Sequence, residues 1–222
     1  MRNFSDCTYL HSLNVGMISA IIGKWSGMSD EDQHMLVTCG LFHDIGKLMI
    51  PPEILNKPGR LTDEEFKIMK SHTVKGYEII KDLPLDDHIK NCALMHHEKI
   101  DGSGYPYGLK GNEIDEFAKI LTIADVYDAL TAARIYRGPM CPFDAIEIFE
   151  KDGFHLYETK YLLKFLQNVI NSYMHSHVIL TNGAEGEVIM MNTNKLSRPV
   201  IHSGSDFIDL SKSSQVKIEK II

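Results

Sequence analysis

Histidine and aspartate residues with the character of metal ligands recur along the first 125 residues of this sequence. They are His11, His43, Asp44, His72, His96, His97 and Asp125. Imidazole and carboxylate groups together suit Fe, Mn or Zn. Most of these residues have apolar neighbours, as Phe42 precedes His43. Burying so many polar groups is costly unless a partner satisfies them. A pair of metal ions would be such a partner.

Each of these residues also has a simpler interpretation. A single histidine among apolar residues is most often a core histidine that is hydrogen-bonded within the fold. The adjacent pair His43-Asp44 is weak evidence by itself, because such dipeptides are common. The joint occurrence of seven metal-type groups therefore carries the metal hypothesis, and a purely structural helical domain would leave them unexplained.

Three segments resemble the motifs of a known family. Residues 41–47, Leu-Phe-His-Asp-Ile-Gly-Lys, resemble the HD-x-G-K core of the HD hydrolase superfamily. Residues 96–106, His-His-Glu-Lys-Ile-Asp-Gly-Ser-Gly-Tyr-Pro, resemble the HHE-x-x-DG-x-GYP signature of the HD-GYP family. Residues 123–131 resemble the family's third block. The resemblance covers the chain from about residue 8 to about residue 173, and a chance match to the long second motif is very improbable.

The resemblance implies a helical bundle that encloses two or three metal ions, usually iron or manganese. The matching ligands here would be His11, His43, Asp44, His72, His96, His97 and Asp125. Asp44 would bridge two metals. Two metals roughly 3.5–4 Å apart can clamp the attacking and leaving oxygens of a phosphodiester and lower the pKa of a bound water to about 7. With Asp44 and Lys47 as catalytic residues, in-line attack would release a linear dinucleotide.

The resemblance also implies four substrate contacts, at Lys47, Tyr105, Arg134 and Arg137. Lys47 would touch the scissile phosphate, although a solvated lysine at a helix C-terminus is also compatible with its position. Tyr105 can stack or hydrogen-bond. Arg134 and Arg137 are three residues apart, so both can face one phosphate or guanine edge. Surface ion pairing is the alternative for the two arginines.

Other residues in the motifs have supporting interpretations. Asp128 lies one turn beyond the last metal-type aspartate and could orient a ligand or a water. Glu98 could fix a histidine tautomer, or it could simply face solvent. Gly102 and Gly104 are expected to permit the loop geometry that brings Tyr105 inward.

The sequence departs from the family pattern at two positions. Family members with three metals carry a glutamate four residues before the first ligand histidine, and here that position is Cys7. Two divalent metals are therefore expected, and a third is less favoured. The family often has arginine three residues after that histidine, where this chain has Asn14; the pattern does not say what this changes.

Hydrophobic periodicity predicts a mainly α fold, an HD-type helical bundle with a small C-terminal β appendage. Ser29 and Thr62 have the residue types and positions of helix N-caps. We expect helices at about 11–23, 30–42, from 62 onward, 85–97, 114–136, 142–151 and 158–175. Short apolar runs at 178–180, 187–191, 199–201 and 207–210, separated by turns such as Asn182-Gly183, predict strands. The expected domains are residues 1–175 and 176–222.

Composition and charge limit the class of protein. The net charge of −7 and the pI of about 5.9 argue against binding to DNA or RNA duplexes. No signal peptide and no membrane span are evident. The four cysteines, Cys7, Cys39, Cys92 and Cys141, form no CxxC pair and predict reduced thiols in a cytoplasmic protein.

Taken with the resemblance, these features favour a metal-dependent phosphodiesterase of bacterial second-messenger signalling. It would hydrolyse cyclic di-GMP to linear pGpG, with GMP as a further product left open. Two alternatives stay open. One is a phosphodiesterase for another cyclic dinucleotide, such as cyclic GMP-AMP. The other is a receptor or a signalling module that binds a cyclic dinucleotide or a protein partner without catalysis. The sequence gives no indication of an oligomeric state.

Overall fold

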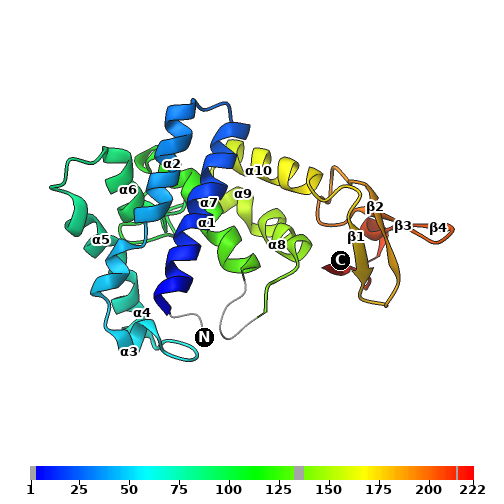
Figure 1. Ribbon diagram of the computed structural model, residues 1–222, viewed down its shortest axis with the longest axis horizontal. Helices are drawn as coiled ribbons and strands as arrows, with labels where there is room; N and C mark the ends of the chain where they lie inside the picture. The colour runs from blue at the N-terminus through cyan, green and yellow to red at the C-terminus, as the bar shows by residue number, and fades with distance from the viewer. Residues whose placement is uncertain (1–3, 133–137, 214) are drawn as a thin grey trace. The chain divides into compact units, whose positions relative to one another are not determined.

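The computed structural model describes residues 4–132, 138–213 and 215–222, with side chains from residue 8 onward (Figure 1). The described chain forms two compact units. The first contains the residues up to Ala129 together with His155–Tyr161. The second contains Leu130–Phe154 and Leu162–Ile222.

Helices dominate the chain up to residue 171. They are α1 (Phe4–Trp25), α2 (Asp30–Phe42), α3 (Pro52–Leu55), α4 (Asp63–Lys70), α5 (His72–Ile80), α6 (Asp87–Met95), α7 (Glu116–Thr131), α8 (Pro142–Ile148), α9 (Phe154–Leu156) and α10 (Thr159–Asn171). Short 3₁₀ turns lie at η1 (Ile45–Met49) and η2 (Gly111–Glu113), and a π-helical turn, η3, follows α8 at Phe149–Gly153. The expectation of a mainly helical fold is confirmed.

Both predicted N-caps are present. The Ser29 side chain accepts a hydrogen bond from the backbone N–H of Asp32, and the Asp32 side chain reciprocates at the Ser29 backbone. Thr62 and Glu65 form the same reciprocal pair at the start of α4. Each capping box satisfies two backbone donors that the first helical turn leaves free, so it fixes where the helix starts.

Two glycines let α1 and α2 cross at very close range. A Cβ atom on Gly40 would lie 2.3 Å from the Cα of Gly16, and one on Gly16 would lie 2.7 Å from the carbonyl oxygen of Val37. No side chain fits at such distances, because real Cβ atoms essentially never approach other atoms so closely. The close crossing brings the His11 ring, on α1, to 5.4 Å from the His43 ring at the end of α2.

Helix α7 is the central element of the first unit. Nine consecutive residues, 117–125, are buried. A helix that is buried on all sides must have other elements packed around it. Its last buried residues include Asp125, so the middle of this helix carries a carboxylate into the interior.

The second unit contains an antiparallel five-stranded sheet. Its strands are β1 (His177–Leu180), β2 (Glu185–Met190), β3 (Val200–Ser203), β4 (Asp206–Asp209) and β5 (Ile218–Ile221), in the spatial order β4-β3-β2-β1-β5. Gly183 and Gly204 have positive φ angles of 84° and 60° in the β1–β2 and β3–β4 turns, which glycine adopts without strain. The sequence pattern predicted four of these strands and missed β5.

The core beneath the sheet includes a residue from the helical part of the chain. Phe143 of α8 is buried in one cluster with Val178, Leu180, Val188, Ile201, Leu210 and Ile218. The sheet and α8 therefore share a core within the second unit. The division at residue 175/176 remains a prediction about how the chain separates into domains. Among the described helices, none is long and apolar enough to span a membrane.

Candidate metal centre

The seven metal-type residues come from five places in the first unit, two within helices and three at helix ends. His11 lies in the middle of α1, and His43 and Asp44 directly follow α2. His72 begins α5, and His96 and His97 directly follow α6. Asp125 lies on the buried helix α7.

The structure brings these residues together as overlapping groups that could each hold a metal ion. One group contains His72, His96 and His97, a second contains His11, His43 and Asp125, and a third contains His43, Asp44 and His96. Within each group, the candidate ligand atoms lie within 4.8 Å of one another.

Asp44 lies between the first two groups. Its Oδ1 is 3.4 Å from Nε2 of His72 and 3.8 Å from Nε2 of His96. Its Oδ2 is 3.3 Å from Nε2 of His43 and 3.7 Å from Nε2 of His11. The two oxygens of one carboxylate thus face two different sets of imidazoles.

Backbone carbonyls orient three of the buried rings. Nδ1 of His43 is 2.7 Å from the carbonyl oxygen of Gly40. Nδ1 of His72 is 2.7 Å from the carbonyl oxygen of Met69. Nδ1 of His96 is 3.0 Å from the carbonyl oxygen of Cys92. Since a carbonyl only accepts, each Nδ1 must carry the proton, and each Nε2 keeps a lone pair near Asp44, with the Nε2 atoms of His72 and His96 also 3.2 Å from each other.

His11 is oriented by a carboxylate instead. Its Nδ1 lies 2.6 Å from Oδ2 of Asp128, and the amide of Asn14 donates to Oδ1 of Asp128 at 2.9 Å. Nε2 of His11 then faces Oδ1 of Asp125 at 3.1 Å. Burial opposes the charged ring, but the hydrogen bonds to Asp125 and Asp128 outweigh it and raise the pKa of His11 to about 9.

Three of the other rings, those of His72, His96 and His97, favour the neutral form. Burial lowers the pKa of His97 to about 4 and also lowers the pKa of His72 and of His96, the last with help from the neighbouring imidazoles. For Asp44, burial favours protonation, but Lys47 and His43 keep its pKa well below the usual range. Neutral imidazole and ionised carboxylate are the forms that bind metal.

Within the part of the chain that the structure describes, two buried atoms of the cluster lack a hydrogen-bond partner, His43 Nε2 and Asp44 Oδ1. An unsatisfied buried acceptor is costly, and each such atom in a native fold calls for a partner. Both are donor atoms to a cation, on residues that belong to the groups above. The residues present therefore fit divalent metal ions at this position.

Exposure falls from one side of the cluster to the other. The side chains of His43, His96, Asp44 and His72 are at most 2% exposed. Those of Lys47 and His97 are 28% and 26% exposed. The cluster therefore opens on the side of Lys47 and His97. Lys47 itself, on η1, forms an ion pair with Oδ2 of Asp44.

The loop after His97 brings Tyr105 against the cluster. The backbone N–H of Tyr105 donates to the carbonyl of His97 at 3.1 Å, and the two rings lie 4.6 Å apart. A Cβ atom on Gly104 would lie 2.5 Å from the His97 carbonyl oxygen, so only glycine allows this approach. Gly102 has a φ of 84°. The expected roles of both glycines agree with these contacts.

Glu98 acts differently from either interpretation of its sequence position. It is 2% exposed, so it does not face solvent. Its carboxylate accepts the backbone N–H groups of Tyr107 at 2.7 Å and Leu109 at 3.0 Å, not a histidine proton. Glu98 therefore holds the loop that carries Tyr105. A carboxylate that accepts two N–H groups satisfies buried donors that the irregular loop cannot pair by itself.

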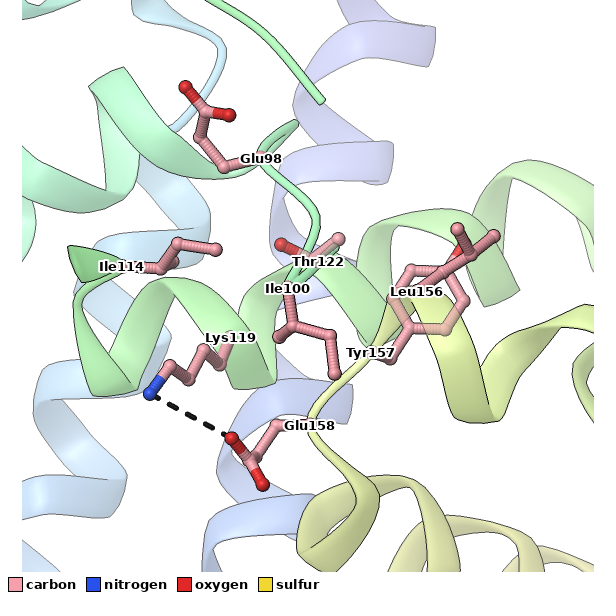
Figure 2. A pocket seen from close by; sticks show the side chains of 8 residues that line it. All are labelled: Glu98, Ile100, Ile114, Lys119, Thr122, Leu156, Tyr157 and Glu158. Carbon is pink, nitrogen blue, oxygen red and sulfur yellow. Dashed lines mark ion pairs between the residues drawn. The ribbon is translucent and has the colours of Figure 1, made fainter. Parts of the chain in front are cut away.

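Glu98 also borders a small pocket on the other side of this loop, shown in Figure 2. The pocket holds about 10 Å³, close to one water molecule. In Figure 2 the Glu98 carboxylate points away from Lys119 and Glu158, which form an ion pair at 3.8 Å. This pocket is too small for a nucleotide.

Some predicted residues cannot be placed. Arg134 and Arg137 lie outside the described residues, as does the side chain of Cys7. Sequence reasoning missed the role of Asn14. A signal was available, because Asn14 follows His11 by three residues as Asp128 follows Asp125, so each pair shares a helix face.

A helical bundle that encloses imidazole and carboxylate groups with the chemistry of metal ligands is typical of a metal-dependent hydrolase. Comparison with known proteins agrees, since residues 7–160 match the HD domain family. The chain belongs to this family, and the HD-GYP resemblance of its motifs is confirmed by its relatives.

Two relatives and one solved structure show the closeness of the match. A cyclic di-GMP phosphodiesterase of Thermotoga maritima is 40% identical over 162 residues, 72% of this chain and 44% of that protein. A 3′3′-cGAMP-specific phosphodiesterase of Vibrio cholerae is 39% identical over 148 residues, 67% of this chain and 34% of that protein. An HDG"Y"P protein from Bdellovibrio bacteriovorus shares the fold, with a TM-score of 0.62 at 22% identity, over 76% of this chain and 54% of that chain. The chain thus spans less than half the length of the two relatives.

Proposed function

We propose that this chain is a metal-dependent phosphodiesterase that hydrolyses a cyclic dinucleotide, with cyclic di-GMP as the favoured substrate. One observation carries the proposal. The two oxygens of Asp44 face two separate sets of imidazoles, with Oδ1 toward His72 and His96 and Oδ2 toward His43 and His11. A carboxylate in this position could help to hold two metal ions, and two-metal sites are suited to phosphodiester cleavage.

The proposed ligands are His11, His43, Asp44, His72, His96, His97 and Asp125. Two divalent ions bound there, iron or manganese in this proposal, supply Lewis acidity that lowers the pKa of a water and draws charge from the phosphodiester. Asp128 and Asn14 hold the His11 ring in its orientation. Lys47, at the open side of the cluster, is placed to meet a phosphate oxygen.

The reaction is a hydrolysis that needs only water as co-reactant. The water oxygen forms a new bond to phosphorus, and the bond from phosphorus to the ribose O3′ breaks. O3′ leaves with a proton, which gives linear pGpG with a 5′-phosphate. A second cut of the same kind would give GMP.

The choice of substrate class rests on Tyr105 and on the relatives. Tyr105 lies against His97, where a base can stack on it. Burial raises the pKa of Tyr105, so its hydroxyl remains a hydrogen-bond donor. Both relatives are named as phosphodiesterases of cyclic dinucleotides. Arg134 and Arg137 are proposed as further substrate contacts on the motif alone.

We further propose a cytoplasmic location, which the free thiols of Cys39, Cys92 and Cys141 support. Cyclic dinucleotides act in bacterial signalling, so protein partners in a signalling pathway are part of the proposal. A non-catalytic receptor is the main alternative. The complete ligand set, with Lys47 beside it, favours catalysis over that alternative.

The test is turnover by protein purified without oxygen and loaded with Fe(II) or Mn(II). Cyclic di-GMP, 3′3′-cyclic GMP-AMP and cyclic di-AMP would be followed by chromatography. The variant Asp44→Asn, which keeps the shape of the side chain and removes its charge, would run beside the native protein with bound metal measured in both. We expect one of the cyclic dinucleotides to be cleaved, and the cleavage to fall at least 10²-fold in the variant.

Cleavage of 3′3′-cyclic GMP-AMP in preference to cyclic di-GMP would keep the mechanism and change the substrate. If two metals bind but no cyclic dinucleotide is cut, while one binds tightly, the receptor alternative replaces the phosphodiesterase.

A further inference from the structure

A second aromatic ring and a lysine lie next to Tyr105. Both belong to α4, a helix that contributes no residue to the candidate metal ligands. Phe66, on α4, packs edge-on to Tyr105 with ring centroids 6.5 Å apart. Nζ of Lys70, one turn later on the same helix, lies 5.1 Å from the Phe66 ring centroid and 5.7 Å from that of Tyr105. The three side chains form one group, the Phe66–Lys70–Tyr105 cluster.

This group continues from the open side of the metal cluster. The Tyr105 ring lies 4.6 Å from the ring of His97, whose side chain is among the exposed ones of the cluster. Phe66 is 47% exposed. The order His97, Tyr105, Phe66 thus leads outward from the candidate metal centre along a row of aromatic rings.

The charge of Lys70 is not neutralised within the described part of the chain, where no carboxylate lies within ion-pair distance of its Nζ. Lys47, by contrast, is already paired with Asp44. A cyclic dinucleotide carries two phosphates, and only one is cleaved at a time. A binding site for a cyclic dinucleotide therefore benefits from a cation near the second phosphate. Lys70 is available for that ion pair.

We propose that Phe66 and Lys70 bind the nucleotide of the substrate that is not being cleaved. The exposed face of Phe66 stacks on its base, and Lys70 meets its phosphate. The proposal rests on the proposed function, because it assigns part of the same substrate. It also explains why an aromatic ring and a lysine stay partly exposed at this place, since stacking on a base and pairing with a phosphate both require accessible groups.

A purely structural role makes a different prediction. If Lys70 served only to hold Tyr105 through cation–π contacts, removing its charge would disturb every reaction of the site. If it binds the second phosphate, only substrates that have one would be affected. Bis(4-nitrophenyl) phosphate, which has a single phosphodiester, separates the two roles.

The test compares the metal-loaded native protein with Lys70→Met, Phe66→Leu and Lys70→Arg. Lys67→Met is the matched control, because Lys67 lies on the same helix and is exposed. The measurements are kcat, KM and Kd for the cyclic dinucleotide, and kcat/KM for bis(4-nitrophenyl) phosphate. We expect Lys70→Met and Phe66→Leu to raise KM and Kd roughly tenfold, with kcat within about twofold. The Lys70→Arg and Lys67→Met variants should stay close to the native protein, and hydrolysis of the small diester should be unchanged.

Three outcomes would overturn the subsite, and they differ in what they mean for the proposed function. If the native protein binds and cleaves a cyclic dinucleotide but the variants match it, the subsite is wrong and the proposed function stands. If both substrates lose activity equally in Lys70→Met, the lysine only supports Tyr105, and the subsite is again wrong. If the native protein neither binds nor cleaves any cyclic dinucleotide, the proposed function falls, and the subsite falls with it.

Discussion

At the scale of single residues, the buried histidines depend on hydrogen bonds that the motifs do not contain. His43, His72 and His96 each direct Nδ1 at a backbone carbonyl three or four residues earlier. The motifs made the ligand types and their order predictable. They could not reveal the tautomers, because a carbonyl acceptor leaves no trace in residue identity. Glu98 is similar, since its partners are backbone N–H groups of residues 107 and 109.

The Glu98 carboxylate can be tested directly. Glu98→Gln keeps the shape of the side chain but removes its charge and one acceptor, so the N–H of Tyr107 or of Leu109 loses its partner. We expect a loss of roughly 2 kcal/mol in the free energy of unfolding, together with a higher KM for the cyclic dinucleotide because Tyr105 moves. Denaturant unfolding, metal content and steady-state kinetics measure these effects.

Glu113→Gln is the control for that experiment, since Glu113 is exposed and accepts one backbone N–H, that of Lys110, at 2.9 Å. It should cost well under ~1 kcal/mol. Equal losses in both variants, or lower metal content in Glu98→Gln with an unchanged KM, would contradict the loop-holding role.

The lowered pKa of His97 predicts how the metal-free protein responds to pH. The folded pKa of about 4 is below the unfolded value of about 6.5. The unfolded chain therefore binds a proton first as the pH falls. The stabilising contribution is complete above about pH 6.5 and is lost as the pH falls toward 4.

Between pH 7 and 4.5, the metal-free native protein should lose roughly 2 kcal/mol more than His97→Gln. The comparison with the variant cancels the titration of groups that do not contact His97. Melting curves recorded in the presence of a chelator measure the difference. If the stability of the two proteins falls by the same amount between pH 7 and 4.5, His97 is not held neutral by burial.

At the scale of elements, the close α1–α2 crossing should control the position of His11. Gly40→Ala places a Cβ where the backbone of Gly16 lies. The helices must separate, which we expect to cost about 1–3 kcal/mol and to move His11 away from His43. Bound metal should fall from two equivalents toward one, as measured by elemental analysis.

Gly138→Ala is the control for that change, because no atom of the described residues lies within 4 Å of its Cβ position. It should leave the metal content unchanged. Two metals bound with native affinity by Gly40→Ala would mean that the crossing does not determine the site.

The first residues of helices were predictable where the sequence carries strong capping signals. They were missed where tertiary contacts determine the start of the helix. Ser29 and Thr62 indicated the starts of α2 and α4 correctly. The break between α4 and α5 at Ser71 was not expected, because no side-chain cap marks it. This break affects the candidate metal centre, because α5 starts with His72. Strand β5 was missed because Glu219 and Lys220 interrupt its apolar run.

At the scale of the molecule, the boundary between the predicted domains is open to test. The sequence placed Phe143 in the helical part, and nothing in a helical pattern tells which core a phenylalanine joins. In the structure it is 3% exposed and packs with the strand residues. Removing residues 176–222 would uncover it, so a chain that ends at residue 175 should bind a hydrophobic dye and melt several degrees lower.

Replacing Phe143 with serine in the shortened chain should reduce the dye binding, because the uncovered ring causes it. A shortened chain with an unchanged melting temperature and no dye binding would instead establish residues 1–175 as an independent domain.

We propose that two metal ions, which Asp44 and its neighbouring histidines would hold, make this chain a phosphodiesterase. The most direct measurement is a titration of metal-free protein with Mn(II) or Fe(II) under nitrogen, with bound metal and cleavage of cyclic di-GMP recorded at each step. The account predicts that activity appears only as the second equivalent binds, and that Asp44→Asn never reaches that state. Full activity with no metal, or with a single equivalent, would contradict it.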